Sequence, residues 1–347
     1  MTIDRFIAEQ PEILEAILAE VPGQLSVLDP IASGGPIYLV GSGTSMNALV
    51  AVEALFDRLV PAGARIRGPL AFLAEMDRVR KRKGLAIILS QTGSSTTTVE
   101  AVRRARDRGM RTVTLTAVRH SPIGHVSDEL VVIPVGPEPV GPKTKGYTAS
   151  LLALMLLARS LAGERLEPNG FTTDLSQLIA YARGAVAELA ETCEGADFCM
   201  AMGQDRHYAT ALEGSLKLSE MSGVAAAAFD TEEAFHGRFH GLGMFSVALF
   251  VAATTTQHEM ATTGATVLSD LGVKARILNL AETLPGPHDL PLPWPATNRC
   301  PELDLISAIV PFQLLACELA KRKGLTPERM RYPDLSHRLR IKTGSAP

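Results

Sequence analysis

One stretch of the sequence concentrates groups that can hold an anion. Six Ser and Thr residues lie among residues 90–97, directly after the apolar run Leu85–Leu89, and a helical pattern follows from Val99. Backbone N–H groups at a helix N-terminus favour an anion, and hydroxyl groups add uncharged donors. The stretch has one glycine and no lysine, so it is not a Walker-type loop. By itself it fits a Ser/Thr-rich helix cap equally well.

A carboxylate further along the chain could perform acid–base chemistry. Glu220 ends the helical segment 211–220, and Lys217 lies about one turn before it. A general acid–base group of this kind contributes roughly 10²–10⁴-fold to a rate. The plainer interpretation of Glu220 is a solvated helix residue. Lys217 either tunes that carboxylate or is a surface lysine.

Two histidines and two glutamates form a third cluster: Glu232, Glu233, His236 and His240. The histidines are one helical turn apart, a spacing that can bind zinc. Gly237 lies between them and the His-Glu-x-x-His order is absent, so zinc is the minority interpretation and no metal is expected. A packing or capping role is favoured for His240.

The elements that must position these groups alternate between strand and helix. Strands are predicted at 36–40, 87–89, 111–116, 130–134, 197–202, 245–251 and 275–280. Helices are predicted at 4–18 with a break at Pro11, at 46–59, from about 99 to 108, and at 148–162, 175–192, 211–220, about 258–271 and 304–323. This alternation implies parallel sheets covered by helices on both faces.

The two halves of the chain repeat one scheme. Nineteen residues separate Ser90 from Gly109, and nineteen separate Ala253 from Gly272. The predicted fold class is therefore α/β, with two flavodoxin-like domains, 1–170 and 171–347, related by internal pseudo-symmetry. Ligands of such sheets bind beyond the strand C-termini, where the loops at Gly41, Ser90 and Gly203 are expected. That position favours an anion site over a cap.

Bulk composition narrows the function classes. The 347 residues are 46% hydrophobic and carry a net charge of −3, which provides no general attraction to nucleic acid or an anionic membrane. Four cysteines without a C-x-x-C pair indicate a reducing compartment. The opening residues lack a signal-peptide pattern, and the apolar run 150–161 is too short to span a bilayer. A cytoplasmic protein is expected.

The sequence resembles a tandem SIS (sugar isomerase) protein. The nearest pattern is the isomerase half of glucosamine-6-phosphate synthase, with its stand-alone phosphosugar isomerase, deaminase and deglycase relatives. The matching motifs occur in family order over nearly the whole chain: Glu9-Gln10-Pro11, Gly41–Ser45, Ser90–Ser95, Thr144–Thr148, Ala211–Glu220, His236-Gly237 and Pro311–Ala316. The sequence shows no glutaminase domain, so glutamine-dependent synthesis is not expected.

The resemblance implies a role for each matching residue. Phosphate ligands would be Ser90, Gln91, Thr92 and Ser95, and sugar hydroxyl ligands would be Thr44 and Ser45. Glu220 would carry a proton between C1 and C2. His236 would open the sugar ring from the partner subunit of a homodimer. Lys145 either pairs with the phosphate or caps its loop.

One departure from the family lies in the C-terminal tail. His337 occupies the position of a lysine that can form an imine with the open sugar, and Lys342 is a possible substitute. The segment 140–143, with Lys143, also departs from the small residues usual there. Because histidine forms no stable Schiff base, these changes fit a deaminase, a deglycase or an aldose–ketose isomerase without an organic cofactor. A glucosamine-6-phosphate deaminase-like enzyme is favoured, and the alternatives are a deglycase of glycated-amine 6-phosphates and a non-catalytic sugar-phosphate sensor.

Overall fold

The structure is a computed structural model that describes residues 2–26, 35–297 and 300–341. Its strands are β1 Ile37–Val40, β2 Ala64–Arg67, β3 Leu85–Leu89, β4 Arg111–Thr116, β5 Glu129–Val132, β6 Phe198–Gly203, β7 Ala225–Asp230, β8 Ser246–Ala252 and β9 Lys274–Asn279. Its α-helices are α1 Ile3–Ala8, α2 Gln10–Leu25, α3 Thr44–Leu59, α4 Pro69–Asp77, α5 Thr96–Asp107, α6 Lys145–Leu161, α7 Phe171–Cys193, α8 Arg206–Lys217, α9 Thr231–Phe235, α10 Thr255–Asp270, α11 Asp304–Arg322 and α12 Leu335–Arg338. Three other helical turns are the π-helix η1 Leu218–Ser222 and the 3₁₀ helices η2 Arg238–Gly241 and η3 Pro301–Leu303.

The chain forms two compact units, each built on one parallel sheet. The five-stranded unit comprises Glu12–Glu138, Lys145–Glu167 and the tail from Tyr332. The four-stranded unit comprises the opening residues to Pro11, the segment Pro139–Thr144 and Pro168–Arg331. The α/β class with two parallel sheets flanked by helices is as predicted. The five-stranded sheet lies within the predicted domain 1–170, and the four-stranded sheet lies within the predicted domain 171–347. The compact units differ from these bounds, because the residues up to Pro11 and Pro139–Thr144 belong to the four-stranded unit and the tail belongs to the five-stranded unit.

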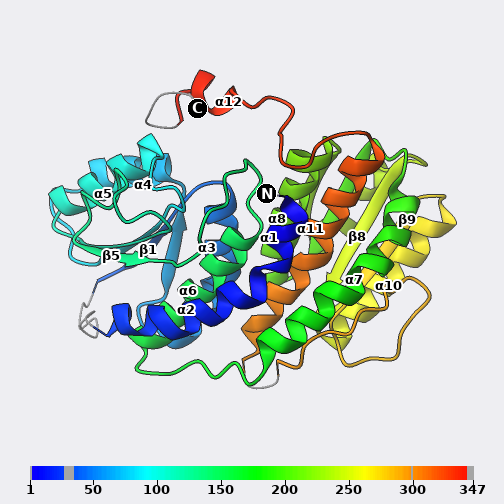
Figure 1. Ribbon diagram of the computed structural model, residues 1–347, viewed down its shortest axis with the longest axis horizontal. Helices are drawn as coiled ribbons and strands as arrows, with labels where there is room; N and C mark the ends of the chain where they lie inside the picture. The colour runs from blue at the N-terminus through cyan, green and yellow to red at the C-terminus, as the bar shows by residue number, and fades with distance from the viewer. Residues whose placement is uncertain (1, 27–34, 298–299, 342–347) are drawn as a thin grey trace. The chain divides into compact units, whose positions relative to one another are not determined.

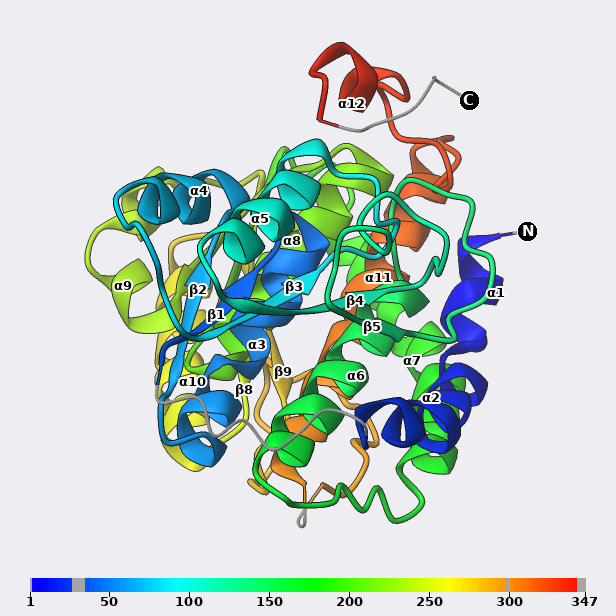
Figure 2. The same cartoon turned by 90° about the vertical axis from the view of Figure 1, so that its left-hand side faces the viewer.

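The five-stranded sheet has the order β2-β1-β3-β4-β5, and every neighbouring pair is parallel (Figure 2). This is the flavodoxin-like order, whose direction reverses between β1 and β3. Helices α4 and α5 cover one face, and α3 and α6 cover the other (Figure 1). All five residues of β3 are buried, as expected for a central strand covered on both faces.

The four-stranded sheet has the order β7-β6-β8-β9, again entirely parallel. This order matches that of the first four strands of the other sheet, and it reverses between β6 and β8. Helix α8 packs on β6 and β7 and contacts α11, which in turn contacts α7. Helix α10 packs on β8 and β9. Residues of α9 and α10 pack together with Phe250 and Met202 in one hydrophobic core cluster of this unit.

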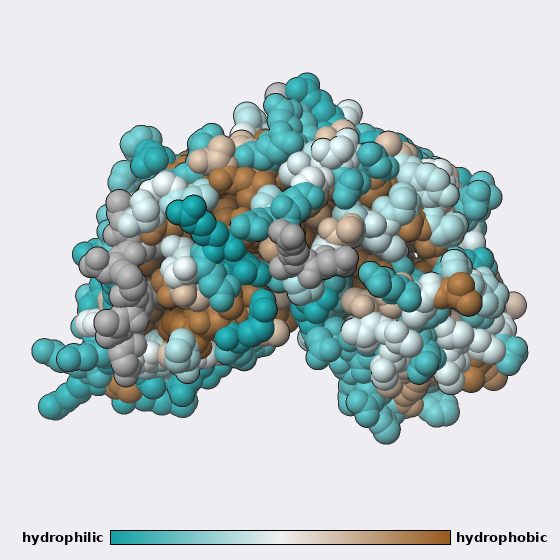
Figure 3. Space-filling model, turned by 90° about the horizontal axis from the view of Figure 1, so that it is seen from below, coloured by the Kyte–Doolittle hydropathy of each residue, from teal (hydrophilic) through white to brown (hydrophobic). Residues whose placement is uncertain are grey.

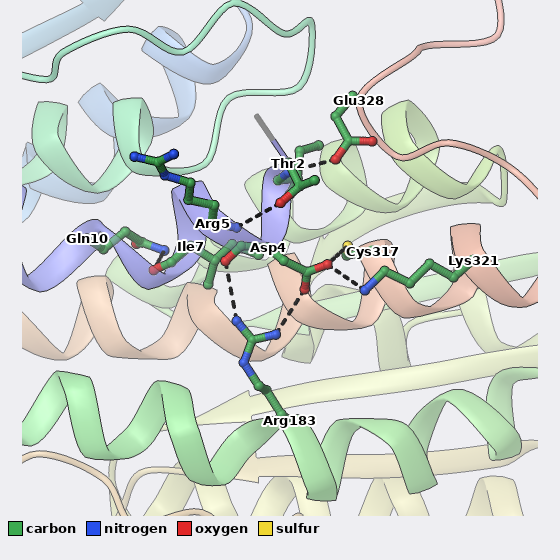
Figure 4. Close-up of polar contacts among 10 residues, drawn as sticks. Thr2, Asp4, Arg5, Ile7, Gln10, Arg183, Cys317, Lys321 and Glu328 are labelled. Carbon is green, nitrogen blue, oxygen red and sulfur yellow. Dashed lines mark hydrogen bonds and ion pairs between the residues drawn. The ribbon is translucent and has the colours of Figure 1, made fainter.

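The first helix is anchored within the four-stranded unit by one carboxylate (Figure 4). Asp4 accepts hydrogen bonds from Arg183 of α7 at 2.9 Å and from Lys321 of α11 at 2.5 Å. Burial alone would raise the pKa of Asp4, but the hydrogen bonds from these two cations lower it. Since α1 bonds to two helices distant in sequence, its place in this unit follows from charge as well as from the buried Phe6.

Helix α11 is the apolar centre of the same unit. Among the described residues, Pro301–Arg322 is the one helical stretch long and apolar enough to cross a membrane, and 94% of its most apolar window is buried inside the protein. Burial of this kind is that of a core helix. On the face drawn in Figure 3, hydrophobic side chains reach the surface in separate patches among hydrophilic ones.

Candidate functional site

The six residues Ser90–Ser95, here called the hydroxyl loop, connect the end of β3 to the start of α5. Ser90 is buried and its N–H donates to the carbonyl of Leu115 at 3.0 Å, which extends the sheet by one residue. Gly93 has a φ of +63°, and a Cβ at this position would lie 2.2 Å from the hydroxyl of Ser121. Only glycine fits this close turn. The hydroxyls of Thr92 and Ser94 lie 3.0 Å apart.

The hydroxyl loop does not cap its helix through a side chain. Ser95 is the N-cap residue of α5, yet it makes no side-chain capping bond, and its hydroxyl instead accepts from Thr98 at 2.8 Å. The corresponding loop after β8 behaves differently, because Thr254 caps α10 by accepting from the N–H of Gln257. The two loops look alike in sequence, but the capping interpretation applies only to the second.

A second loop lies beside the hydroxyl loop at the same edge of the sheet. Gly41–Ser45 follows β1, which pairs directly with β3. Gly43 has a φ of +58° and forms the N-cap of α3 without a side-chain capping bond. Thr44 and Ser45 are half-buried in the first turn of α3. The two loops thus flank the point where strand order reverses, the usual ligand position in such a sheet.

The equivalent point of the four-stranded sheet is closed by internal bonds. The side chain of Gln257 donates to Asp205 at 3.2 Å and accepts from the N–H of Ala253 at 2.9 Å. A carboxylate therefore lies where the other sheet has hydroxyls. The reversal point at the hydroxyl loop therefore remains the candidate for an anion site.

A buried carboxylate that the sequence analysis missed lies beside the hydroxyl loop. Glu138, 7% exposed, accepts from the N–H of Gly146 at 3.1 Å and from the side chain of Gln91 at 3.4 Å. Lys145 is also buried and begins α6, three residues earlier than the helix predicted from Thr148. The Pro- and Gly-rich composition of residues 134–142 gave no signal for a buried glutamate.

Glu220 belongs to a chain of three charged side chains at the end of α8. The Lys217 ammonium lies 3.2 Å from Glu213 and 2.5 Å from Glu220. Lys217 and Glu213 are completely buried, whereas 23% of the Glu220 side chain is exposed. Lys217 is therefore a partner of the carboxylate and not a surface lysine. The i, i+4 spacing of Glu213 and Lys217 was the signal that could have revealed Glu213.

The backbone around Glu220 is irregular. Helix α8 ends at Lys217 and continues as the π-helix η1 to Ser222, and Gly223 ends it with a φ of +64°. π-Turns are rare and occur often at functional sites. The hydroxyl of Ser222 donates to the carbonyl of Leu218 at 2.7 Å, which stabilises the wider turn. This turn directs Glu220 back toward Lys217 while Leu218 and Met221 are buried.

The charge of Lys217 is secured by its neighbours. Complete burial alone would lower the pKa of Lys217, but the charges of Glu213 and Glu220 outweigh burial and raise it above its usual value. The ammonium therefore stays protonated across the physiological range. It can hold Glu220 in place but cannot act as a base.

The two histidines of the third cluster are both exposed. His236 is the C-cap of α9, and His240 lies in the last turn of η2. Of the two roles expected for His240, packing is wrong because the side chain is exposed, and capping stays a prediction. Glu232 and Glu233 are exposed in the first turn of α9, whose cap is Asp230. Within the described parts of the chain, no group of three or more His, Cys, Asp or Glu side chains could hold a metal ion.

The tail residues are only partly described. His337 belongs to α12, and its side chain lies outside the described part of the structure. Lys342 lies outside the described residues altogether. Lys143 donates to the carbonyl of Val140 at 2.7 Å within the Pro139–Thr144 segment.

Comparison with known proteins finds a family match in the first part of the chain. Residues 31–160 match the family model of the SIS domain. Over 344 residues the chain is 27% identical to a glutamine–fructose-6-phosphate aminotransferase (isomerizing) of Pyrobaculum aerophilum, an alignment that covers 94% of this chain and 55% of the relative. The chain thus spans about half the length of the curated relatives that it matches.

Solved structures share the fold of the whole chain. The C-terminal domain of a glucosamine-fructose-6-phosphate aminotransferase from Francisella tularensis has a TM-score of 0.77 at 18% identity, with 94% of this chain and 97% of that chain covered. A glucosamine-6-phosphate deaminase from Thermotoga maritima also has a TM-score of 0.77, at 21% identity, with 96% and 98% covered. At these identities the likeness establishes the fold alone.

The buried ion pair of Lys217 with Glu213 predicts how substitutions at these two positions change the stability of the protein. Lys217→Met should lower the free energy of unfolding by about 3 kcal/mol, because Glu213 keeps its buried charge and loses the ammonium beside it. In the double variant with Glu213→Gln, at least half of this loss should return, since both buried charges are then gone. Urea unfolding measures all three proteins. Equal stability of Lys217→Met and the unsubstituted protein would contradict this account.

Proposed function

Because residues 31–160 match the family model of the SIS domain, we propose that this chain is an enzyme acting on a 6-phosphorylated sugar or amino sugar. In this proposal the hydroxyl loop holds the phosphate, and Glu220 moves a proton between C1 and C2 of the open-chain sugar. Among the activities of this class, we favour that of a glucosamine-6-phosphate deaminase. The relatives named above are aminotransferases of fructose 6-phosphate and a deaminase of glucosamine 6-phosphate, which supports this substrate class.

The observation that carries the chemical part is the contact between Lys217 and Glu220. Lys217 engages Oε2 of the carboxylate, while the side chain of Glu220 keeps 23% of its surface exposed. A carboxylate held by a buried cation on one side and open on the other can accept a proton from carbon and return it. The π-turn fixes its direction, so little conformational freedom is lost on reaction.

The phosphate part is supported by the uncapped start of α5. Ser90, Thr92 and Ser95 offer hydroxyls there, and Thr44 and Ser45 offer further hydroxyls across the β1–β3 reversal point. A helix N-terminus without a capping side chain favours an anion. One of its N–H groups, that of Thr96, donates to the carbonyl of Ile341 in the tail at 3.4 Å. Lys145 lies buried at the start of α6 and adds a positive charge to the same unit.

An amino sugar would follow the same path with one further step. Transfer of the C2 proton to C1, together with a proton lost from the amine nitrogen and one gained by O1, converts an open-chain 2-amino aldose into an imine at C2 with a hydroxymethyl group at C1. Water then adds to the imine, and ammonia leaves to give the ketose phosphate. His337 stands where the family that the sequence resembles has a lysine amine. As an imidazole, it can transfer a proton near neutral pH without forming a covalent imine.

A conservative substitution separates chemistry from binding. Glu220→Gln should reduce kcat by at least about 10³-fold, since the amide cannot take a proton from carbon. The dissociation constant for the sugar phosphate should change little, because Glu220 does not belong to the hydroxyl loop. Steady-state kinetics and titration calorimetry provide the two measurements. As a matched variant, Ser95→Ala should weaken binding and leave kcat nearly unchanged.

The substrate panel for these assays comprises glucosamine 6-phosphate, fructose 6-phosphate and a fructosamine 6-phosphate, with ammonia and ketose followed separately. Ammonia from the first substrate identifies a deaminase, and free amine from the third identifies a deglycase. Retained turnover in Glu220→Gln with any of them would end the assignment of Glu220. Binding without turnover of every substrate would favour a sensor instead.

Ring opening is assigned to His236 in a homodimer, as in the family that the sequence resembles. His236 is exposed at the end of α9 and pairs with no carboxylate among the described residues, so it is available to a second subunit. Analytical ultracentrifugation should therefore give a dimer at micromolar concentration. A strictly monomeric but active protein would remove His236 of a partner from the mechanism.

A further inference from the structure

A contact of the buried carboxylate Glu138 with the half-buried Gln91, next to the hydroxyl loop, is not explained by the roles assigned so far. Glu138 receives two hydrogen bonds on the same oxygen, Oε2, from the N–H of Gly146 and from the side-chain amide of Gln91. Glu138 follows β5, Gln91 follows β3 and Gly146 is in the first turn of α6. One carboxylate oxygen thus joins three segments of the five-stranded unit.

Gly146 makes this contact possible. A Cβ built on Gly146 would lie 1.7 Å from Nε2 of Gln91 and 2.4 Å from its Cδ, far inside van der Waals distance. The amide of Gln91 therefore lies directly against the backbone of α6. Any side chain at position 146 would have to displace the amide from Glu138.

The backbone of Gln91 is fixed as firmly as its side chain. Its carbonyl accepts from the N–H of Ala117 at 3.0 Å and from the hydroxyl of Thr116 at 3.1 Å. Both ends of the residue are thus engaged by the protein. The residues on either side of it, Ser90 and Thr92, belong to the loop that holds the phosphate in the proposed function.

We propose that Glu138 and Gly146 are positioning residues of the phosphate site and that Gln91 connects them to the hydroxyl loop. The side chain of Gln91 acts as a spacer between the loop and α6, and it is not itself a phosphate ligand. This differs from the role that the family resemblance implies for Gln91. The inference rests on the proposed function for its ligand, but the contact itself does not.

The experiment is a double-mutant cycle between positions 91 and 146, with fructose 6-phosphate as the probe. Gly146→Ala should raise the KM or the dissociation constant about tenfold, the loss expected when a hydrogen bond to a charged group is broken, with kcat within about twofold. The melting temperature should hardly fall, because alanine favours the helix and a flexible side chain can move aside. In the Gln91→Ala background, Gly146→Ala should have no further effect, since the displaced atoms are absent.

Two variants at position 138 test the acceptor. Glu138→Ala should raise KM as Gly146→Ala does, and Glu138→Gln should recover most of that loss because an amide oxygen can accept both hydrogen bonds. A general structural role would lower kcat and stability together and would give no such recovery. Independent, additive effects at positions 91 and 146, or an unchanged KM in both Gly146→Ala and Glu138→Ala, would overturn the inference.

A measurement without ligand separates this inference from the proposed function. The side-chain amide protons of Gln91 should exchange slowly with solvent in the unsubstituted protein and rapidly in Gly146→Ala, as followed by NMR. Rapid exchange in the unsubstituted protein would refute the contact, whatever the ligand is. Slow exchange together with no binding of any sugar phosphate would refute the proposed function and leave the contact standing.

Discussion

The complete burial of the Lys217 ammonium is the constraint on which the candidate active carboxylate depends. A charge without access to water needs compensating charges, and Glu213 and Glu220 provide them from the same helix. Glu213 satisfies the regular i, i+4 spacing, but Glu220 is only three residues beyond Lys217. The helix widens into a π-turn directly after Lys217, and this turn brings Glu220 to the ammonium without burying it fully. The electrostatic requirement and the local backbone irregularity thus have the same location.

The two sheets repeat one strand order but use their reversal points differently. In the four-stranded sheet, Thr254 and Gln257 satisfy the helix start and the neighbouring Asp205, so the site is closed by its own side chains. In the five-stranded sheet, Ser95 does not cap α5, and its hydroxyl accepts a hydrogen bond from Thr98 instead. The same strand order thus accompanies a closed reversal point in one sheet and, in the proposed function, an anion site in the other.

Sequence reasoning succeeded where the pattern was strong and local. The strand, loop and helix from Leu85 into α5 are present in the predicted order, but α5 begins at Thr96, three residues before the predicted start. Strand β4 has the predicted bounds. Two edge strands were missed because their composition is atypical: β2 has the sequence ARIR, and β7 begins with four alanines. Their positions depend on pairing with a neighbouring strand, which no local pattern records.

The candidate site shows the same limit. Glu220 and Lys217 were identified from the sequence, but Glu138 was not, because its partners lie 47 and eight residues away. In the sequence, Gly146 is recognisable only as part of the motif Thr144–Thr148. The structure explains why a glycine is needed there, because the amide of Gln91 lies directly against it. Contacts between loops that follow different strands arise from the sheet order, so the sequence alone gave no access to them.

Solvent-exchange NMR tests most directly whether this chain moves a proton between C1 and C2. Fructose 6-phosphate or glucosamine 6-phosphate is incubated with the protein in D₂O until equilibrium and followed over many turnovers. The account predicts that deuterium accumulates at C1 or C2 and at no other carbon, because in a fraction of turnovers the proton held by the partly exposed Glu220 exchanges with solvent before it returns to carbon. Conversion of the sugar with no deuterium at either carbon would contradict proton transfer by Glu220.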